Sequence, residues 1–417
     1  MAEIKKASGV IDWLDQRLAV KTLAKVLMTE YWIPKNINFL WAMGVVLVVL
    51  FKILIISGIF LLMYYKPDIN LAFDSVNYTI MQEVEYGWLW RHVHGVAASV
   101  IFLVIYIHMF TGIYYGSYKK GREIIWLTGM ALFGIFSAEA FSGYMLPWGQ
   151  MSYWAAQVIT NLFGGIPLIG PELVIWIRGD YLVADATLTR FFMLHVLLLP
   201  LAIILLIAVH FYSLRIPHVN NQEGEEFDFD KEAKKYQEGR TKESKVVPFW
   251  PVFLSKDFFV VGVALTGFFY LVCYHYNFAM DPINFEPANN MKTPAHIYPE
   301  WYFLWSYEVL RGFFFDVAGI AAMDIGLAAF GFANVIFMLL PFLDRDTERV
   351  APAHKRPLFK YWFWLLVIDM IVLTVYGKLP PTGPNAWVGF FAALSFILLF
   401  VALPIITKME AKVGGEK

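Results

Sequence analysis

Eight apolar runs, each long enough to cross a lipid bilayer as a helix, constrain this chain more than any other feature. The hydrocarbon core of a bilayer is about 30 Å thick and a helix rises about 1.5 Å per residue, so a span needs about 20 apolar residues. The runs are Phe39–Tyr65, Gly95–Tyr115, Ile124–Leu146, Phe191–Tyr212, Phe258–Phe278, Ile325–Leu343, Phe359–Tyr376 and Trp387–Ile406. We therefore expect an all-α membrane protein with eight transmembrane helices.

The composition supports this expectation and excludes several functions. Of the 417 residues, 59% are hydrophobic and only 16% are charged, whereas soluble domains are about 45–50% apolar. This excludes a soluble globular enzyme. The formal net charge of −1 offers no basis for nucleic-acid binding. The one cysteine, Cys273, excludes an intrachain disulfide, a thiolate-bound iron–sulfur cluster and a multi-cysteine zinc site.

Lysine and arginine are distributed unequally between the two sides of the expected membrane. Residues 1–37, the C-terminal tail and the loops on the same side hold 25 of the 33, the opposite loops hold 7, and Lys52 lies within the first run. Because cytoplasmic loops carry the positive excess, both termini are predicted to be cytoplasmic. Residues 1–37 also have no apolar core of the kind found in cleaved secretion signals.

The runs divide the chain into five parts. Residues 1–37 are predicted to be either an interfacial helix or a solvated helix packed on the bundle. The remaining parts are a first helical bundle at 38–216, a cytoplasmic linker at 217–255, a second transmembrane region at 256–406 and a tail at 407–417. Two outer loops, Pro147–Arg190 and 279–320, are long, apolar and rich in Trp, Pro and Gly. Function is expected in these loops.

Four histidines lie in two of the predicted spans, where ionisable residues are costly and indicate function. His94 and His108 are 14 residues apart, and His195 and His210 are 15 apart on a helix that runs in the same direction. Each spacing is about four helical turns, so the two rings on one helix project from the same side of it, about 21 Å apart along the axis. Facing imidazoles at two levels suit two haems with two histidine ligands each, whereas a zinc ion would need further ligands. Satisfied core histidines are the ordinary alternative.

Two pairs of glycines repeat this vertical separation. Gly44 and Gly58 are 14 residues apart in the first run, and Gly129 and Gly143 are 14 apart in the third. A residue without a side chain lets a helix approach a flat macrocycle, although small residues are also common at ordinary helix contacts. The four helices of residues 38–216 are therefore predicted to form a bundle that holds two stacked haems.

Two arginines precede the outer histidines of these helices. Arg91 lies three residues before His94, and Arg190 lies five residues before His195. Each guanidinium is expected either to pair with the propionates of an outer haem or to anchor its helix among lipid headgroups.

An acidic residue, Glu300, stands between a proline and two aromatic residues in the motif Pro299–Tyr302 of the second outer loop. At membrane depth such a carboxyl has a raised pKa and is a candidate proton acceptor near neutral pH. The segment Ser142–Asn161 contains a turn and then an amphipathic stretch of the first outer loop. We expect the two loops to close over the outer haem and to hold a lipid-soluble substrate between them.

These motifs closely resemble those of cytochrome b of the cytochrome bc family, the membrane subunit of quinol:cytochrome c oxidoreductases. The resemblance extends from about Asn38 to Pro404. It rests on Pro299–Tyr302, which matches the family's Pro-Glu-Trp-Tyr signature, and on Gly143–Ser152, which matches Gly-Tyr-x-Leu-Pro-Trp-Gly-Gln-Met-Ser. A third match is Ala186–His195, at the entry to the fourth helix of the family.

The resemblance implies roles for particular residues. His94 and His195 would bind the iron of a low-potential haem b, and His108 and His210 that of a high-potential haem b. Glu300 and Tyr302 would handle quinol and its proton. The outer quinol site would also include Tyr144, Pro299, Trp301 and Tyr307. The inner quinone site would include Asp257, Lys256, Arg215 and His218, the last of which has a loop-anchoring role as an equal alternative.

The resemblance also implies a reaction and partners. Quinol would be oxidised at the outer site, with one electron passing to a Rieske iron–sulfur protein and the other crossing the membrane to reduce quinone. A c-type cytochrome subunit, membrane lipid and quinone would be the other partners. The complex would be a homodimer in a bacterial inner membrane.

Some residues depart from the bc pattern. The 15-residue histidine spacing and Ile177–Gly179 resemble the photosynthetic b/f branch, so a b/f-type subunit is an alternative. That branch is split into two polypeptides and has a cysteine for a third, covalent haem where this chain has Ala42, so a third haem is not supported. Thr111 stands where many bc relatives have an arginine near the inner haem, and Arg215 stands where mitochondrial-type relatives have a quinone-binding histidine.

Two more distant alternatives fit less of the sequence. A dihaem membrane anchor of another dehydrogenase would have fewer helices and no need for the motif Pro299–Tyr302. A secondary transporter would use the histidines as a proton relay, but no internal inverted repeat is evident.

Overall fold

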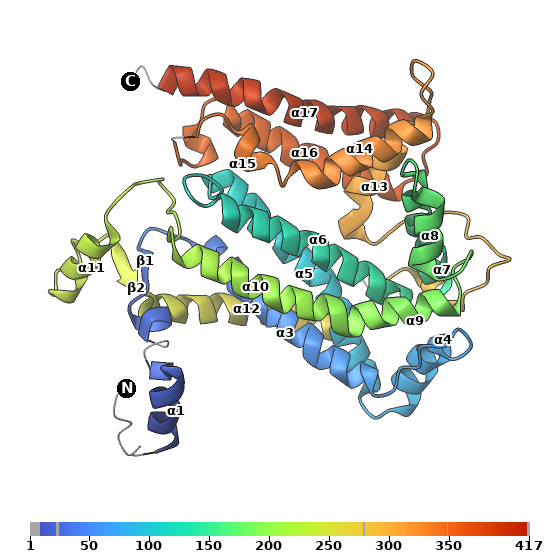
Figure 1. Cartoon of the computed structure of the whole chain (residues 1–417), viewed down its shortest axis with the longest axis horizontal. Helices are drawn as coiled ribbons and strands as arrows, with labels where there is room; N and C mark the ends of the chain where they lie inside the picture. Colours follow the sequence, from blue (N-terminus) through green and yellow to red (C-terminus); the bar gives the residue numbers. More distant parts are fainter. Residues whose placement is uncertain (1–8, 22–24, 278–279, 348, 415–417) are drawn as a thin grey trace.

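The computed structural model describes residues 9–21, 25–277, 280–347 and 349–414. The parts of the predicted segments that fall on 1–8, 22–24, 278–279, 348 and 415–417, among them the end of the fifth apolar run, lie outside the described residues. Within the described residues the chain is almost entirely helical (Figure 1).

Seven of the predicted spans are confirmed as helices long and apolar enough to cross a membrane. They are Phe39–Leu62, Gly87–Tyr115, Glu123–Met145, Asp185–Arg215, Phe249–Tyr274, Phe359–Lys378 and Pro384–Lys412. They contain the helices α3 (Met43–Leu62), α5 (Gly87–Tyr115), α6 (Glu123–Met145), α9 (Asp185–Met193), α10 (Leu199–Arg215), α12 (Leu254–Tyr274), α16 (Phe359–Lys378) and α17 (Pro384–Gly414).

The remaining predicted span, Ile325–Leu343, is a shorter apolar helix. The 15 residues of α14 (Ala322–Ile336) are followed by a turn and by α15 (Leu340–Leu343). Pro341, the second residue of α15, lacks the backbone N–H that a continuous helix would use, which explains the interruption. The eighth transmembrane helix therefore stays a prediction.

Shorter elements cover the two ends of the long helices. They are α1 (Val10–Leu18), β1 (Trp32–Pro34), α4 (Ala72–Asp74), α7 (Gln150–Leu162), α8 (Gly170–Arg178), α11 (Phe229–Gln237), β2 (Val246–Pro248) and α13 (Leu304–Arg311). Short 3₁₀ and π segments are η1 (Lys25–Thr29), η2 (Phe39–Ala42), η3 (Ser75–Glu83), η4 (Phe163–Gly165), η5 (Leu194–Leu198), η6 (Phe249–Phe253), η7 (Pro282–Phe285), η8 (Trp301–Phe303) and η9 (Ala353–Lys355). The amphipathic stretch expected after Ser142 is α7.

The long helices form two groups that pack side by side (Figure 1). In the first group α3 packs against α5, and α6 against α10, with α12 against α5 and α3. In the second group α13, α14, α16 and α17 pack together. One apolar core joins the groups, because it contains Ile113 of α5 and Trp126 of α6 together with Trp362 and Phe396 of the second group.

A buried ionic cluster fastens the second group at the end where the two termini lie. Arg356 is fully buried, and its guanidinium donates to Asp344 over 2.8 and 3.1 Å and to Glu410 over 2.9 Å. Lys119, just after α5, forms a second ion pair with Asp344 over 2.8 Å. Burial raises the pKa of the Asp344 carboxyl, but Arg356 and Lys119 outweigh this and hold it below its ordinary value. The cluster ties the end of α17 to the loop after α5.

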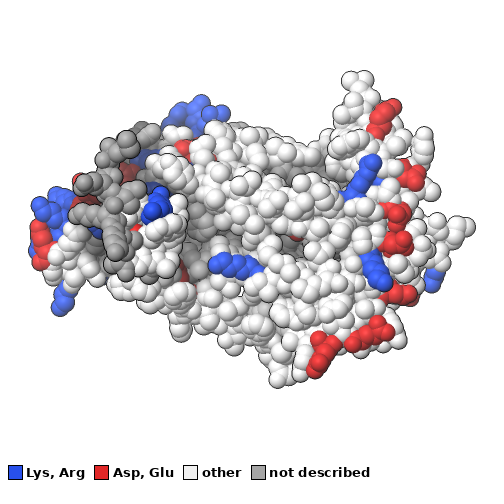
Figure 2. Space-filling view, turned by 60° about the horizontal axis from the view of Figure 1, so that its bottom comes forward, with Lys and Arg blue, Asp and Glu red and all other residues white. Residues whose placement is uncertain are grey.

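Charged side chains gather at the two ends of the molecule and leave a broad band nearly free of charge between them (Figure 2). Lysine and arginine concentrate at the end that carries α11 and the chain termini, and acidic residues predominate at the other end. This distribution is what a helical protein that crosses a bilayer requires.

Candidate haem and quinol sites

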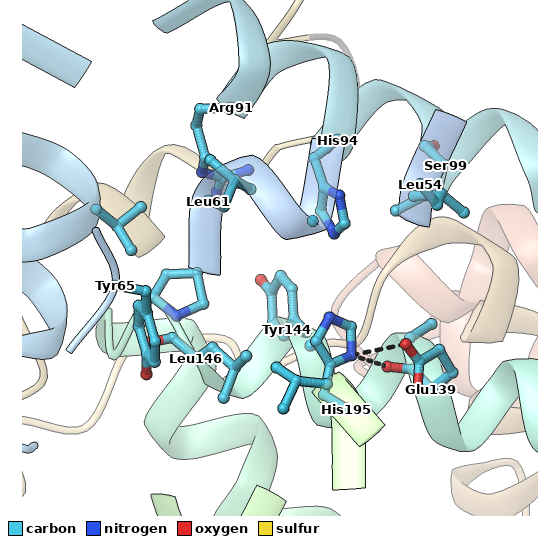
Figure 3. Close-up of a pocket in the computed structure, with 18 of the residues that line it drawn as sticks. Leu54, Leu61, Tyr65, Arg91, His94, Ser99, Glu139, Tyr144, Leu146 and His195 are labelled. Carbon is cyan, nitrogen blue, oxygen red and sulfur yellow. Dashed lines mark hydrogen bonds and ion pairs between the residues drawn. The ribbon is translucent and has the colours of Figure 1, made fainter. Parts of the chain in front are cut away.

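The two outer histidines face each other across the first helical group. His94 on α5 and His195 in turn η5 have ring centroids 6.2 Å apart, with planes at 80° (Figure 3). Metal–nitrogen bonds of about 2 Å on either side of one iron give a ring separation of about 6 Å. Among the described residues no group of three or more His, Cys, Asp and Glu could hold a metal ion. Two axial imidazoles without further ligands suit a haem.

The π turn η5 explains the 15-residue spacing on the second helix. His195 lies in this turn, between α9 and α10, and His210 lies in α10. A π turn closes over one residue more than an α turn, so it absorbs the extra residue of the spacing. The second helix therefore presents its two rings much as the 14-residue spacing of α5 does.

Three of the four rings are oriented through the nitrogen that would not bind iron. Hydroxyl oxygens meet the Nδ1 atoms in the pairs Ser57 with His94 at 2.9 Å, Thr128 with His210 at 3.0 Å and Ser142 with His195 at 3.5 Å. A partner at Nδ1 fixes the tautomer and directs Nε2 at the metal. Each of these hydroxyl residues directly precedes one of the glycines singled out above, which is a sequence signal that was missed.

Each of the four glycines faces one of the four histidines. A Cβ atom on Gly58 would lie 3.3 Å from Cε1 of His94, on Gly129 3.3 Å from Cε1 of His210, and on Gly44 3.7 Å from Cε1 of His108. A Cβ atom on Gly143 would collide with the ring of His195. The absent side chains therefore let the imidazoles lie against the helix backbones, in addition to the expected approach to a macrocycle.

One cavity joins the outer histidine pair to the motif of the second outer loop. His94, His195, Glu300 and Tyr302 all line it, together with Arg91. Further lining residues are Tyr65, Gly58, Gly143, Tyr144, Met280, Asp281, Asn284 and Phe285. The wall is otherwise mostly apolar, which suits a haem edge and a lipid-soluble substrate in adjoining compartments.

Glu300 is a titratable group of this cavity that lies outside the transmembrane helices. Burial raises its pKa to about 7, a hydrogen bond with Tyr144 and the charge of Arg91 lower it, and the charge of Asp281 raises it. A carboxyl with a pKa near 7 exchanges protons readily at neutral pH.

The loop that carries Glu300 is fixed to α5, the helix that carries His94. Trp301 donates its indole N–H to Ser99 over 2.7 Å, and the Tyr106 hydroxyl donates to the backbone oxygen of Tyr302 over 2.5 Å. Trp305 in turn donates to the Tyr106 hydroxyl over 2.8 Å. The same helix therefore sets the positions of the carboxyl and of the outer histidine.

The two outer loops are also joined to each other. The backbone N–H of Gln150 donates to Glu286 over 2.9 Å, and the backbone N–H of Ser152 donates to the Asn284 side chain over 2.8 Å. The loops are thus joined by hydrogen bonds, and Met280, Asp281 and Asn284 of the second loop line the cavity of the outer histidine pair.

Comparisons with known proteins agree along most of the chain. Residues 28–217 match the family described as "Cytochrome b/b6/petB", and residues 287–410 match "Cytochrome b(C-terminal)/b6/petD". Cytochrome b of Rhodobacter capsulatus is 41% identical over 416 residues, which cover 97% of this chain and 92% of that protein. Cytochrome b of Rickettsia typhi is 41% identical over 407 residues, or 97% of this chain and 96% of that protein.

The chain belongs to the cytochrome b family. Its fold agrees with a chain of a solved structure titled "Hyperthermophilic respiratory Complex III", with a TM-score of 0.87, 39% sequence identity and coverage of 97% of this chain and 100% of that chain. The resemblance expected from the sequence motifs is confirmed, and membership of the family implies haem b.

Not every residue expected at the outer site lines the cavity of this cytochrome b. Tyr144 does, whereas Pro299, Trp301 and Tyr307 are absent from its wall. Trp301 holds the loop, and Tyr307 donates to the backbone oxygen of Ile297 over 3.0 Å.

Of the two arginines expected near an outer haem, only Arg91 lies on the cavity wall. Arg190 donates to the backbone oxygen of Trp176 and packs against Gly179, so it holds the end of α8.

At the inner end, sequence reasoning missed an aromatic residue. Tyr31 stacks on His218 at 5.5 Å, and the Arg215 guanidinium lies 3.7 Å from the centre of the Tyr31 ring. The Tyr31 hydroxyl, Arg215 Nη1, His218 Nδ1 and Asp257 Oδ1 are buried and have no hydrogen-bond partner. Asp257 is itself buried, and Lys256 is exposed. Buried polar atoms are usually hydrogen-bonded, so four unpartnered ones are consistent with the binding of a polar ligand such as a quinone headgroup.

Proposed function

We propose that this chain is the membrane subunit of a bacterial quinol:cytochrome c oxidoreductase, a bc-type complex III with a Rieske protein and a c-type cytochrome. It oxidises quinol at the outer site and reduces quinone at the inner site, which contributes to a proton gradient. The observation that carries this proposal is the cavity shared by the His94–His195 pair and Glu300.

In this proposal the histidine pairs hold two haems b that supply one-electron transfer when bound. His94 and His195 hold the outer, low-potential haem, and His108 and His210 the inner, high-potential one. Nδ1 contacts from Ser57 and Ser142 keep the outer rings directed at each other. Arg91 on the cavity wall is placed to pair with propionates.

Glu300 takes the proton of the quinol hydroxyl at the outer site. Its position between Tyr144 and Arg91 keeps the carboxyl at the cavity wall, and the loop contacts with α5 hold it there. Tyr302 stacks on Phe102 at 4.0 Å and presents its ring to the same cavity. The joined outer loops shield the substrate from water.

At the inner site Tyr31, Arg215 and His218 bind the quinone headgroup through their unpartnered polar atoms. Asp257, a buried carboxyl at the start of α12, is the acidic residue that the family resemblance implies for this site. Both termini lie on this side, which is cytoplasmic, so protons for quinone reduction come from the cytoplasm. The complex is a homodimer, as the family resemblance implies.

The Glu300→Gln variant tests the outer proton acceptor. We expect quinol oxidation to slow by about 10²-fold or more, because an amide does not accept the proton, while both haems remain bound. The rate of the unaltered protein should fall as the pH drops below 7, since only the ionised carboxyl accepts a proton and its pKa is about 7.

Steady-state quinol:cytochrome c reductase assays from pH 5.5 to 9 measure both effects. Glu286→Gln is the matched control, because this carboxyl is in the same loop but exposed. Glu300→Gln with normal turnover, or with an unchanged pH profile, contradicts the proposed role.

A further inference from the structure

Glu139 is a carboxyl within α6 for which the sequence offers no role. Its side-chain Oε1 lies 3.1 Å from Nδ1 of His195, and its own backbone oxygen lies 3.0 Å from the same nitrogen (Figure 3). One residue thus presents two acceptors to one ring N–H. The side chain also lines the outer cavity.

The position of Glu139 on α6 is coupled to that of Gly143. The two residues are four apart, so they lie on the same helix face, one turn from each other. Gly143 provides the gap that admits the His195 ring, and Glu139 provides the acceptors. The helix is shaped to hold this one imidazole.

His195 differs in this respect from the other rings with a side-chain partner at Nδ1. His94 and His210 meet the hydroxyls of Ser57 and Thr128, whereas His195 meets a carboxyl in addition to the more distant Ser142 hydroxyl. The second oxygen of Glu139, Oε2, is buried without a hydrogen-bond partner. An acidic side chain in a membrane helix with an unpaired oxygen is costly, which indicates a functional rather than a packing role.

We propose that Glu139 is a positioning residue that orients His195 and strengthens it as a ligand. This inference rests on the proposed function. The carboxyl shares the Nδ1–H with the backbone oxygen, which directs Nε2 of His195 toward His94. A stronger acceptor at Nδ1 makes the imidazole more basic, and a more basic ligand favours the oxidised iron. Glu139 therefore lowers the midpoint potential of the outer haem relative to the inner one.

Redox titration of both haems in the intact membrane complex tests this inference. Glu139→Leu is expected to raise the midpoint potential of the outer haem by at least about 59 mV, which corresponds to a tenfold higher ratio of reduced to oxidised iron at a given potential. The midpoint potential of the inner haem should not change. Glu139→Gln is expected to shift the same haem in the same direction by less, because its amide oxygen still accepts the hydrogen bond.

Asp369→Asn is the matched control, because Asp369 is a buried carboxyl of α16 with one oxygen unpartnered. It should leave both midpoints unchanged. If Glu139→Leu does not retain the outer haem, the Glu139→Gln titration decides. The inference is overturned if the outer midpoint stays constant in the decisive variant, or if both haems shift equally. Failure of the proposed function is distinguishable, because the unaltered protein would then show no pair of haem transitions.

Discussion

The His195 ring packs so closely against Gly143 that no side chain fits at this position. A Cβ atom there would overlap the His195 ring, whereas Gly134 on the same helix has no atom within 4 Å of a built Cβ. Overpacking of this kind costs about 1–3 kcal/mol or forces the ring to move. The ring is the group that moves, since the helix backbone is held along its length.

The Gly143→Ala variant should therefore lose or displace the outer haem and leave the inner one bound. Haem content and the reduced-minus-oxidised spectrum of purified protein measure this. Gly134→Ala should behave as the unaltered protein does. Full outer-haem occupancy with an unshifted spectrum in Gly143→Ala would refute the contact.

At the residue scale, the candidate site residues that could be predicted from the sequence are the ionisable ones within apolar segments. Four histidines and one loop glutamate are conspicuous in membrane helices and loops because such residues are costly there. Ser57, Thr128 and Ser142 are not conspicuous, since a hydroxyl in a helix usually bonds to its own backbone. Their roles become visible only when a second helix brings a ring to them.

At the scale of elements, the loop that carries Glu300 depends on α5. Tyr106 of α5 donates to the Tyr302 backbone and accepts from the Trp305 indole, so it is the centre of this attachment. Removal of the Tyr106 hydroxyl leaves the Trp305 indole N–H without that acceptor, which lowers the stability of the fold by about 1–3 kcal/mol.

Tyr106→Phe should slow quinol oxidation several-fold while both haems remain bound, because the loop shifts and the histidines do not. Tyr114→Phe, on the same helix, is the control, since the Tyr114 hydroxyl meets His354 rather than the loop. Reductase assays and haem spectra on both variants separate the effects. Equal activity of the two variants would show that the attachment does not position Glu300.

Elements were predictable where their pattern is local. Seven long helices and α7 follow from apolar length and amphipathicity, whereas the break at Pro341 shortens α14. The segment Met280–Phe285 lines the cavity without any periodic signal of its own. Tyr31, which contacts Arg215 and His218, directly precedes β1, and β1 pairs with β2 more than two hundred residues later. No local pattern encodes that pairing.

At the scale of the whole molecule, the two haems of the proposed function, held at two levels of one bundle, require both matched histidine pairs. The rings of one pair face each other at 6.2 Å, and each of the four rings has its own glycine. The buried cluster around Arg356, together with Lys119, fastens the inner end of the second helical group to the loop after α5. In the proposed function, this bundle connects an outer quinol site with an inner quinone site.

Haem content with a reduced-minus-oxidised spectrum, measured on the unaltered chain and on His195→Leu, tests the central claim most directly. We expect two b-type haems per chain in the unaltered protein, with two distinct redox transitions. His195→Leu should lose the outer transition alone. A single haem in the unaltered protein, or both transitions retained in the variant, would contradict the assignment of the two histidine pairs.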